Sequence, residues 1–160
     1  LVITSPALAA AESIPAPLVA VANVVGKLAP GLRTIALEGD AISRDQAVRD
    51  DYDRDPYNFR GKLTAGTGRQ MNVAIGAALA DAGRITCPVL VLHGTADRLT
   101  APIGSERFVA AVSSTDRTLR TWPGAYHELH HEPERDEVLA TITGWITDHL
   151  SAVGGSTPSK

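Results

Sequence analysis

The sequence predicts an α/β fold in which a parallel β-sheet carries helices on its faces. Three short segments, 1–4, 89–92 and 118–122, have the composition of β-strands. Two segments with apolar residues at spacings of three and four, 102–112 and 133–150, are typical of amphipathic helices. Because alternating strands and helices favour right-handed parallel crossovers, we expect three parallel strands with flanking helices.

The first strand lies at the very start of the chain. Residues 1–4 (Leu-Val-Ile-Thr) precede Ser5-Pro6, and so short an apolar run is typical of a strand buried on both faces. A domain rarely begins inside its most buried strand, because that strand would lack a neighbour on one side. We therefore expect the chain to be the later part of a longer protein, in which an upstream signal peptide would escape notice.

Residues 6–86 show helical periodicity without a convincing strand, so they are predicted to form an all-helical insertion between two strands of the sheet. The first helix ends at Pro30-Gly31 and has one apolar face, formed by Leu18, Val21, Val25 and Leu28. A charged stretch ends at Asp55-Pro56, where a helix boundary is expected. Segment 61–83 predicts a further helix with an apolar row, formed by Met71, Ile75 and Leu79.

After Cys87-Pro88 the strand–helix alternation begins. The helix that starts at Pro102 is expected to turn four apolar side chains inward, those of Ile103, Phe108, Val109 and Val112. The last helix should bury a longer apolar row, formed by Val138, Leu139, Ile142, Trp145, Ile146 and Leu150. The expected organisation is a core strand in 1–5, a helical lid in 6–86, an α/β core in 87–152 and a disordered tail in 153–160.

Composition narrows the function classes. With 44% hydrophobic residues, the 160-residue chain can build a core, which excludes wholesale disorder. Its net charge of −3 supplies no basic stripe for nucleic acid. A single cysteine excludes a disulfide framework and any multi-cysteine metal site, and it fits a reducing compartment. No apolar run approaches the roughly 18 residues of a membrane span. We expect a cytoplasmic protein that can associate with a membrane.

Two side chains lie where an open parallel sheet gathers reacting groups, just beyond the carboxyl ends of strands. Asp97 lies five residues past Leu92, and His127 lies five past Trp122. If these strands are neighbours, about 4.8 Å apart, their loops emerge side by side. The aspartate can then accept the Nδ1 proton of the histidine and leave Nε2 as a base for a nucleophile. The alternative is a turn-capping carboxylate and an ordinary loop histidine.

Longer stretches around these two residues resemble a known family. Segments 89–99 (VLVLHGTADRL) and 123–128 (PGAYHE) resemble the last third of a monoacylglycerol lipase, an α/β-hydrolase related to lysophospholipases and to the serine aminopeptidase (S33) group. Segment 5–8 (SPAL) resembles the stretch after that family's nucleophile helix. Three further segments resemble its helical lid: 41–45 (AISRD), 55–56 (DP) and 62–68 (KLTAGTG).

The resemblance implies an α/β-hydrolase fold and a serine ester hydrolase for monoacylglycerol or lysophospholipid-like lipids, without cofactor or metal. It implies that Asp97 orients His127, which activates a serine and later protonates the leaving alcohol. The G-x-S-x-G motif of that serine is absent from this sequence, so the nucleophile and oxyanion hole are expected upstream, and this chain alone is predicted to be inactive. Ser5 lacks flanking glycines and Ser105 lies in a predicted helix, so neither is expected to be the nucleophile.

Segment 127–131 (HELHH) also matches H-E-x-x-H, a zinc-protease motif. That site needs both histidines one turn apart on a rigid helix, and Pro123-Gly124 and Pro133 leave room for two turns at most. Zinc is therefore the less favoured interpretation. Under the other interpretation, His130 and His131 are solvated residues ahead of the last helix.

Three further features allow more than one interpretation. Cys87 is predicted to be a buried structural thiol rather than a nucleophile, because His93 lies too far along the same strand to act as its base. Arg98 is expected to anchor the acid loop, with binding of a substrate oxygen as the alternative. Residues 14–29 are apolar nearly all round, so the lid either closes on its own core or makes transient contact with a lipid surface.

Fold and triad do not fix a substrate, so two other functions stay open. One is another α/β-hydrolase chemistry, such as an aminopeptidase or a haloperoxidase-like enzyme. The other is a non-catalytic lipid-binding module. A G-x-S-x-G motif after a strand in the upstream sequence would favour the enzyme, and a natural start at residue 1 would favour the module.

Overall fold

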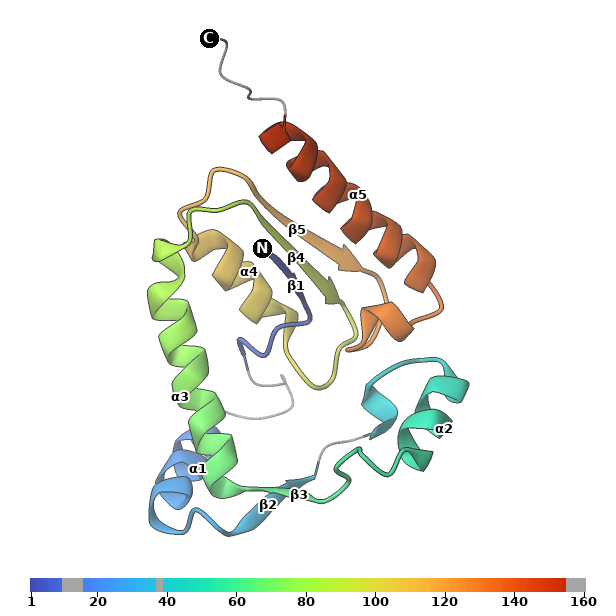
Figure 1. Ribbon diagram of the computed structural model, residues 1–160. Coiled ribbons are helices and arrows are strands. Elements are labelled where there is room, and N and C mark those ends of the chain that lie inside the picture. Colours follow the sequence, from blue (N-terminus) through green and yellow to red (C-terminus); the bar gives the residue numbers. More distant parts are fainter. Residues whose placement is uncertain (10–15, 37–38, 155–160) are drawn as a thin grey trace.

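A computed structural model of the chain describes residues 1–9, 16–36 and 39–154. Its main sheet has three parallel strands, in the order β1 (Val2–Thr4), β4 (Val89–Gly94) and β5 (Arg117–Trp122) (Figure 1). The predicted α/β class and parallel arrangement are confirmed. All residues of the central strand β4 are buried, whereas most of β5 is exposed, so continuous apolar burial is limited to the centre of the sheet.

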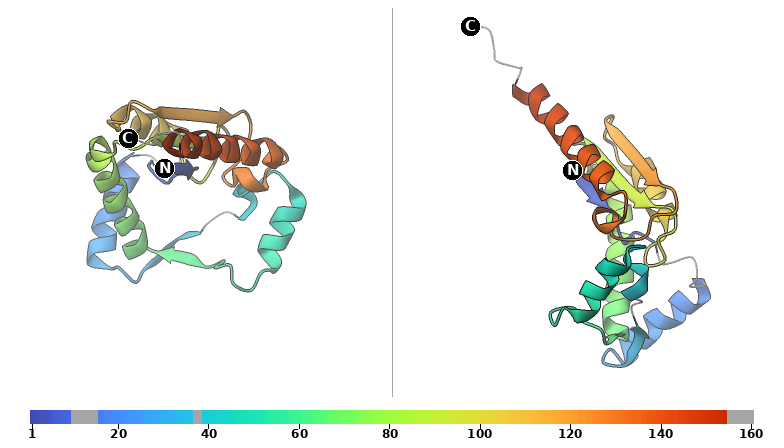
Figure 2. Two further views of the ribbon diagram at one scale, coloured as in Figure 1. Left: turned by 45° about the horizontal axis from the view of Figure 1, so that its top comes forward. Right: turned by 90° about the vertical axis from the view of Figure 1, so that its right-hand side faces the viewer.

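Alternate residues of β4 face two apolar clusters, one on each side of the sheet. The first cluster joins β4 to α4 (Pro102–Ala111) and contains Val89, Val91, Phe108 and Val112. The second joins β4 to α5 (Arg135–Gly154) and contains Leu90, Leu92, Leu129 and Val138. The two helices therefore cover opposite faces of the sheet (Figure 2). This double cover explains why the β4 sequence is apolar at successive positions.

The two helices bury narrower stripes than their apolar spacing predicts. In α4 the side chains of Phe108, Val109 and Val112 contact the core, but Ile103 is exposed. In α5 a single row packs on the sheet, formed by Val138, Ile142 and Trp145. The neighbouring row is exposed, and it contains Leu139, Ile146 and Leu150. The prediction of inward positions was wrong for these four residues, because one helix on a three-stranded sheet makes contact along one row of side chains.

The segment between β1 and β4 forms a cap. Among the described residues, its elements are α1 (Ala16–Leu28), β2 (Arg33–Ala36), η1 (Gly39–Ala41), α2 (Gln46–Arg54), β3 (Lys62–Thr64), α3 (Ala65–Asp81) and η2 (Ala82–Arg84), where η denotes a 3-10 turn. β2 and β3 pair antiparallel, so the prediction of an all-helical insertion was wrong. Strands of three or four residues are too short to display an alternating pattern. The cap lies beyond the carboxyl ends of β4 and β5 (Figure 1).

The helix boundaries in the cap follow local signals. α1 ends before Pro30-Gly31 and α2 ends before Asp55-Pro56, as predicted. The helix expected in 61–83 begins only at Ala65, because the residues before it form β3. Thr64 caps this helix, since its Oγ1 accepts a hydrogen bond from the backbone N–H of Thr67 over 3.2 Å.

The apolar face that spacing predicts for α1 is turned toward solvent. Three of its four members, Leu18, Val21 and Leu28, are more than half exposed. α1 packs on α3 where the backbones are close, since a Cβ on Gly26 would lie 2.4 Å from the carbonyl oxygen of Ala65. Small residues thus make the helix–helix contact, and the apolar row lies on the outside of the cap.

α3 returns the chain from the cap to the sheet. β1 and β4 are parallel neighbours, with Val2 opposite Leu90, so the chain must run back along the sheet before β4 begins, and α3 does so (Figure 1). In the described parts of the chain, no helix combines the length and the apolar character needed to cross a membrane. Residues 155–160 of the tail predicted for 153–160 lie outside the described residues, and its first two residues, 153 and 154, belong to α5 instead.

Candidate active site

The structure brings Asp97 and His127 together at the carboxyl end of the sheet. β4 and β5 are neighbours with Gly94 opposite Trp122, so the loops after both strands leave the same edge. In the acid loop (95–101), Asp97 Oδ2 lies 2.8 Å from His127 Nδ1. The two side chains therefore make the contact that the strand order predicts.

The loop that carries His127, the base loop (123–128), is held against the acid loop. Gly124 N donates a hydrogen bond to Thr95 Oγ1 over 2.8 Å. Gly94 is required where the two loops cross, because a Cβ there would lie 2.3 Å from the carbonyl oxygen of Ala125. The relative position of acid and base is thus set by backbone packing as well as by their own hydrogen bond.

The Asp97 carboxylate is buried and accepts hydrogen bonds on both oxygens. Oδ1 accepts the backbone N–H groups of Leu99 (2.8 Å) and Thr100 (3.0 Å), and Oδ2 accepts the Thr100 hydroxyl (2.8 Å). Burial by itself raises the pKa of this carboxyl. The hydrogen bonds from His127, His93 and the backbone of Thr100 outweigh burial and hold the pKa of Asp97 well below its ordinary value. Asp97 is therefore an anion at neutral pH.

His127 lies between this buried anion and the surface, with 27% of its side chain exposed. An ionised carboxylate can only accept hydrogen bonds, so the hydrogen-bond pattern assigns the ring proton to Nδ1. The lone pair then lies on Nε2, the nitrogen that can take a proton from a nucleophile. A buried carboxylate bound to Nδ1 of an imidazole with a free Nε2 is the arrangement that the acid and the base of a catalytic triad adopt.

The sequence analysis missed the role of His93 in this site. His93 is fully buried, and its Nε2 lies 3.2 Å from the same Asp97 oxygen that contacts His127. Its Nδ1 lies 2.7 Å from Ser105 Oγ. The prediction considered His93 only as a partner for Cys87 along the strand. The turn after Gly94 brings Asp97 back toward His93, and the spacing of four residues was the signal that could have found this contact.

The serines weighed as nucleophiles have other surroundings. Ser105 is buried inside α4, as predicted, and contacts His93. Ser5 follows β1 with a φ of 42°, and its backbone N–H donates to Leu92 O over 2.8 Å. In the described part of the chain, its buried hydroxyl oxygen has no hydrogen-bond partner.

The H-E-x-x-H motif does not form the helix that a zinc protease needs. Only the short turn η3 (Leu129–His131) is helical there, and His127 precedes it. His127 Nδ1 is bound to Asp97, and His131 Nδ1 lies 2.7 Å from Glu128 Oε2. Glu128, His130 and His131 bring polar atoms within 4.8 Å of one another, but both histidines are exposed. The hydrogen bond between His131 and Glu128 already occupies two of the three residues in this cluster, so we assign no metal to it.

Cys87 is exposed, so the prediction of a buried thiol was wrong. Burial on this strand begins only at Val89, where β4 enters the sheet. Cys87-Pro88 still belongs to the connection from η2.

Residues 42–44 of the cap are bound to the base loop and to the residues that follow it by hydrogen bonds and ion pairs. Glu128 N donates to Ile42 O over 2.8 Å, and Ser43 Oγ donates to His131 O over 2.8 Å. The guanidinium of Arg44 forms ion pairs with Glu132 and Glu134, which follow η3. The Glu132 side chain is fully buried, so its charge depends on Arg44 for compensation. The cap and the base loop therefore form one hydrogen-bonded unit.

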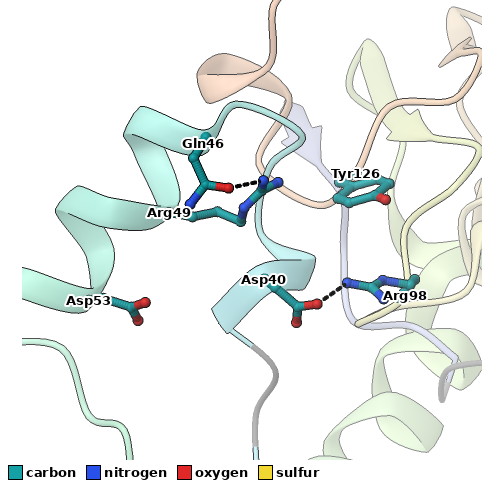
Figure 3. A pocket seen from close by; sticks show the side chains of 6 residues that line it. All are labelled: Asp40, Gln46, Arg49, Asp53, Arg98 and Tyr126. Carbon is teal, nitrogen blue, oxygen red and sulfur yellow. Dashed lines mark hydrogen bonds and ion pairs between the residues drawn. The ribbon is translucent and has the colours of Figure 1, made fainter.

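A polar cavity of about 420 Å³ lies between the cap and the two loops (Figure 3). Its lining residues are Asp40, Gln46, Arg49, Asp53, Arg98 and Tyr126. Arg98 Nη2 lies 3.0 Å from Asp40 Oδ2, and the Arg98 guanidinium lies 5.3 Å from the centre of the Tyr126 ring. The hydrogen bond from Arg98 lowers the pKa of Asp40. Arg98 thus ties the acid loop to the cap and also lines a cavity, so both interpretations of Arg98 remain.

This chain is similar to known hydrolases. A family model described as serine aminopeptidase, S33, matches residues 1–134. Over 151 residues the chain is 43% identical to a monoacylglycerol lipase of Mycolicibacterium smegmatis, covering 94% of this chain and 54% of that protein. Over 161 residues it is 32% identical to a monoglyceride lipase of Mus musculus, covering 99% of this chain and 53% of that protein. The chain spans about half the length of the curated relatives it matches.

The fold is shared as well. The chain superposes on the crystal structure of a monoacylglycerol lipase from Paleococcus ferrophilus with a TM-score of 0.82 and 34% sequence identity, covering 92% of this chain and 58% of that one. The family match and the common fold together show that this chain belongs to the serine aminopeptidase S33 family of α/β-hydrolases.

Proposed function

We propose that this chain supplies the acid and the base of a serine ester hydrolase that acts on monoacylglycerol or lysophospholipid-like lipids. The observation that carries the proposal is the 2.8 Å contact between His127 Nδ1 and the buried Asp97 carboxylate at the carboxyl edge of the sheet. The relatives named monoacylglycerol lipase and monoglyceride lipase support the substrate class. The sequence holds no G-x-S-x-G motif, so we propose that the nucleophile belongs to a part of the protein outside these 160 residues.

In the proposed mechanism, His127 Nε2 takes the hydroxyl proton of the serine as its oxygen attacks the ester carbonyl carbon. The resulting imidazolium keeps its Nδ1–H bond to Asp97, which stays ionised. His127 then gives its proton to the leaving alcohol as the ester C–O bond breaks, which leaves an acyl-enzyme. A water molecule repeats the sequence: His127 takes its proton, the fatty acid leaves, and the proton returns to the serine.

The role of the base is tested in the natural protein that contains this chain. His127→Gln should remove hydrolysis of a short-chain ester and labelling by a fluorophosphonate probe, because both need the base-activated serine. His131→Gln is the matched control, since His131 is exposed and hydrogen-bonded to Glu128 rather than to Asp97. Full activity of His127→Gln would contradict the proposal. The 160-residue chain by itself should not be labelled, and robust labelling would mean that the nucleophile lies within it.

We further propose that the cap touches lipid through α1. The outward row of Leu18, Val21, Val24 and Leu28 supports this, since each is more than half exposed and Leu28 reaches 78%. Only Lys27 adds a basic charge in the last turn, so apolar contact would have to dominate. Such contact would bring a cytoplasmic enzyme to a membrane surface for part of its cycle.

Serine substitutions on this row test the lipid contact. Val21→Ser with Leu28→Ser should lower hydrolysis of emulsified monoacylglycerol several-fold and leave hydrolysis of a soluble ester unchanged. Leu150→Ser on α5 is the control, because it removes an equally exposed leucine outside the cap. Equal effects on both substrates would count against lipid contact.

The family description favours one second candidate, an aminopeptidase. Because fold and triad leave the substrate open, the protein should be offered a monoacylglycerol and an aminoacyl p-nitroanilide side by side. Faster hydrolysis of the ester supports the proposal, and faster hydrolysis of the anilide favours an aminopeptidase instead. If the protein binds lipid and hydrolyses neither compound, the non-catalytic lipid-binding module is favoured.

A further inference from the structure

We propose that His93 is a positioning residue for the base: it donates a second imidazole hydrogen bond to Asp97 and so limits how strongly that carboxylate holds the proton of His127. The inference deepens the proposed function and rests on it, since it concerns the same acid and base. It does not require His93 to touch substrate.

Two imidazole rings share one carboxylate oxygen. Asp97 Oδ2 lies 2.8 Å from His127 Nδ1 and 3.2 Å from His93 Nε2. The side chains of His93 and Asp97 are fully buried, whereas His127 reaches the surface. His93 therefore contacts the acid from within the core, where water does not compete for the carboxylate.

The oxygens near Nε2 determine which nitrogen of the neutral His93 ring carries the proton, because the hydroxyl of Ser105 can either donate or accept. Its Oγ lies 2.7 Å from Nδ1, in the interior of α4. If Nδ1 held the hydrogen, the lone pair of Nε2 would face Asp97 Oδ2 at 3.2 Å without a hydrogen between them. With the hydrogen on Nε2, Ser105 donates to Nδ1, and Nε2 donates toward Asp97 and the carbonyl oxygen of Thr100 at 3.3 Å. This tautomer satisfies every polar atom of the ring.

The second donor has an electrostatic consequence for the base. A hydrogen bond to Oδ2 draws negative charge toward His93, and the remaining attraction for the protonated ring of His127 becomes weaker. Without His93, the carboxylate would stabilise the imidazolium of His127 more strongly. More of the enzyme would then hold His127 in its protonated form at neutral pH, where it cannot accept a proton from the nucleophile.

Other charged groups lie on the elements around His127, and they remain in place when His93 is changed. They are Arg98 on the acid loop, Glu128, His130 and His131 on the base loop and η3, and Asp40, Arg44 and Arg49 on the cap. The described hydrogen bonds and ion pairs of His93 go to Asp97, Thr100 and Ser105 and to none of these groups. A change of His93 therefore acts on His127 through Asp97.

The test compares pH profiles of kcat/KM for a soluble ester in the natural protein that contains this chain. His93→Leu removes the donor, and the acidic limb should move to higher pH by about one unit, the size expected when one hydrogen bond to a charged group is lost. The loss should appear in kcat with little change in KM, because His93 is buried away from substrate. His93→Gln keeps an N–H at a similar reach, and its acidic limb should return toward that of the wild type.

Val91→Ala is the matched control, because it removes buried volume from the same strand without a contact to Asp97. It should lower the urea midpoint of unfolding and leave the acidic limb in place. If His93→Leu fails to fold, His93→Met takes its place, because it also removes the donor and keeps a side chain of similar volume, and the same movement of the limb is expected. An unmoved limb in the folded variant overturns the proposal.

Failure of the inference and failure of the proposed function give different results. If His127→Gln leaves hydrolysis intact, the proposed function fails. The titration of the His127 ring, followed by NMR in wild type and in His93→Leu, then still decides the inference without any measurement of activity. A midpoint that moves to higher pH in the variant supports the role of His93, and an unchanged midpoint rejects it.

Discussion

The oxygens of Asp97 collect hydrogen-bond donors from three places in the fold. The acid loop supplies the backbone N–H of Leu99 and two groups of Thr100, the base loop supplies His127, and β4 supplies His93. These donors favour the charged carboxylate, so the pKa of Asp97 is lowered in the folded state despite burial. Asp97 thus ties three parts of the chain together.

A pH-dependent contribution to stability follows from this lowered pKa. A carboxyl with a lowered folded-state pKa stabilises the fold above its unfolded value, about 3.9, and the contribution is lost as the pH falls toward the folded value. The difference in unfolding free energy between wild type and Asp97→Asn should therefore be large at pH 7 and should narrow below about pH 4. Urea unfolding at several pH values measures it. Asp148→Asn, at an exposed position of α5, is the control, and parallel curves for wild type and Asp97→Asn would contradict the expectation.

At the residue scale, the sequence could predict the pair Asp97–His127, because both follow strands whose carboxyl ends meet. Its only signal for His93 was the spacing of four residues from Asp97, and the contact also depends on the turn after Gly94. The prediction of a buried Cys87 was wrong for a related reason, because apolar neighbours in the sequence do not determine the residue at which burial begins.

At the scale of elements, a short segment of the cap is hydrogen-bonded to the residues at the carboxyl edge of the sheet. Ile42, Ser43 and Arg44 contact the base loop and the residues that follow it. Glu132 accepts from both the backbone N–H and the guanidinium of Arg44. The position of the base therefore depends on residues about 85 positions upstream in the cap.

Loss of this ion pair should cost much more than loss of a surface pair. Arg44→Ala leaves the fully buried Glu132 carboxylate without its charge partner, and the unfolding free energy should fall by about 3 kcal/mol. Arg54→Ala removes a pair whose side chains are both mostly exposed, and its cost should stay below about 1 kcal/mol. Urea unfolding of the two variants makes the comparison. Equal losses would show that Glu132 finds other compensation.

Element prediction from sequence succeeded where the pattern was long and failed where it was short. β4 and the ends of α1 and α2 follow from apolar runs and proline signals. β2 and β3 carry too few residues for a pattern. Periodicity also identified the apolar row of α1 but not whether it faces a core or solvent, because leucine and valine have the same spacing in both cases.

At the scale of the whole molecule, exposed apolar side chains lie at several places, and two of these places can favour association. β1 pairs with β4 on one side only within the described residues, and Leu1 is about half exposed. The outward row of α1 forms the second place. An unpaired strand edge offers hydrogen-bonding groups to another chain, so apolar surface beside it favours association.

The 160-residue chain by itself should therefore self-associate. Sedimentation velocity at micromolar concentration should show species larger than a monomer, and Leu1→Lys should shift the distribution toward the monomer. Leu150→Lys, on the exposed side of α5, should have a smaller effect. A monomeric wild-type chain would show that the edge of β1 is protected.

The direct pairing of β1 with β4 allows the cap to change between related proteins while the sheet stays the same. Because the two strands are adjacent, the segment between Ser5 and Val89 is a detour that leaves the sheet after one strand and rejoins it at the neighbouring strand. A chimera could replace this detour with that of a distant relative without a change in the strand order of the sheet, provided that it kept an arginine to form the ion pair with Glu132. The cap and the sheet edge that carries Asp97 and His127 would then be separately exchangeable parts of one gene.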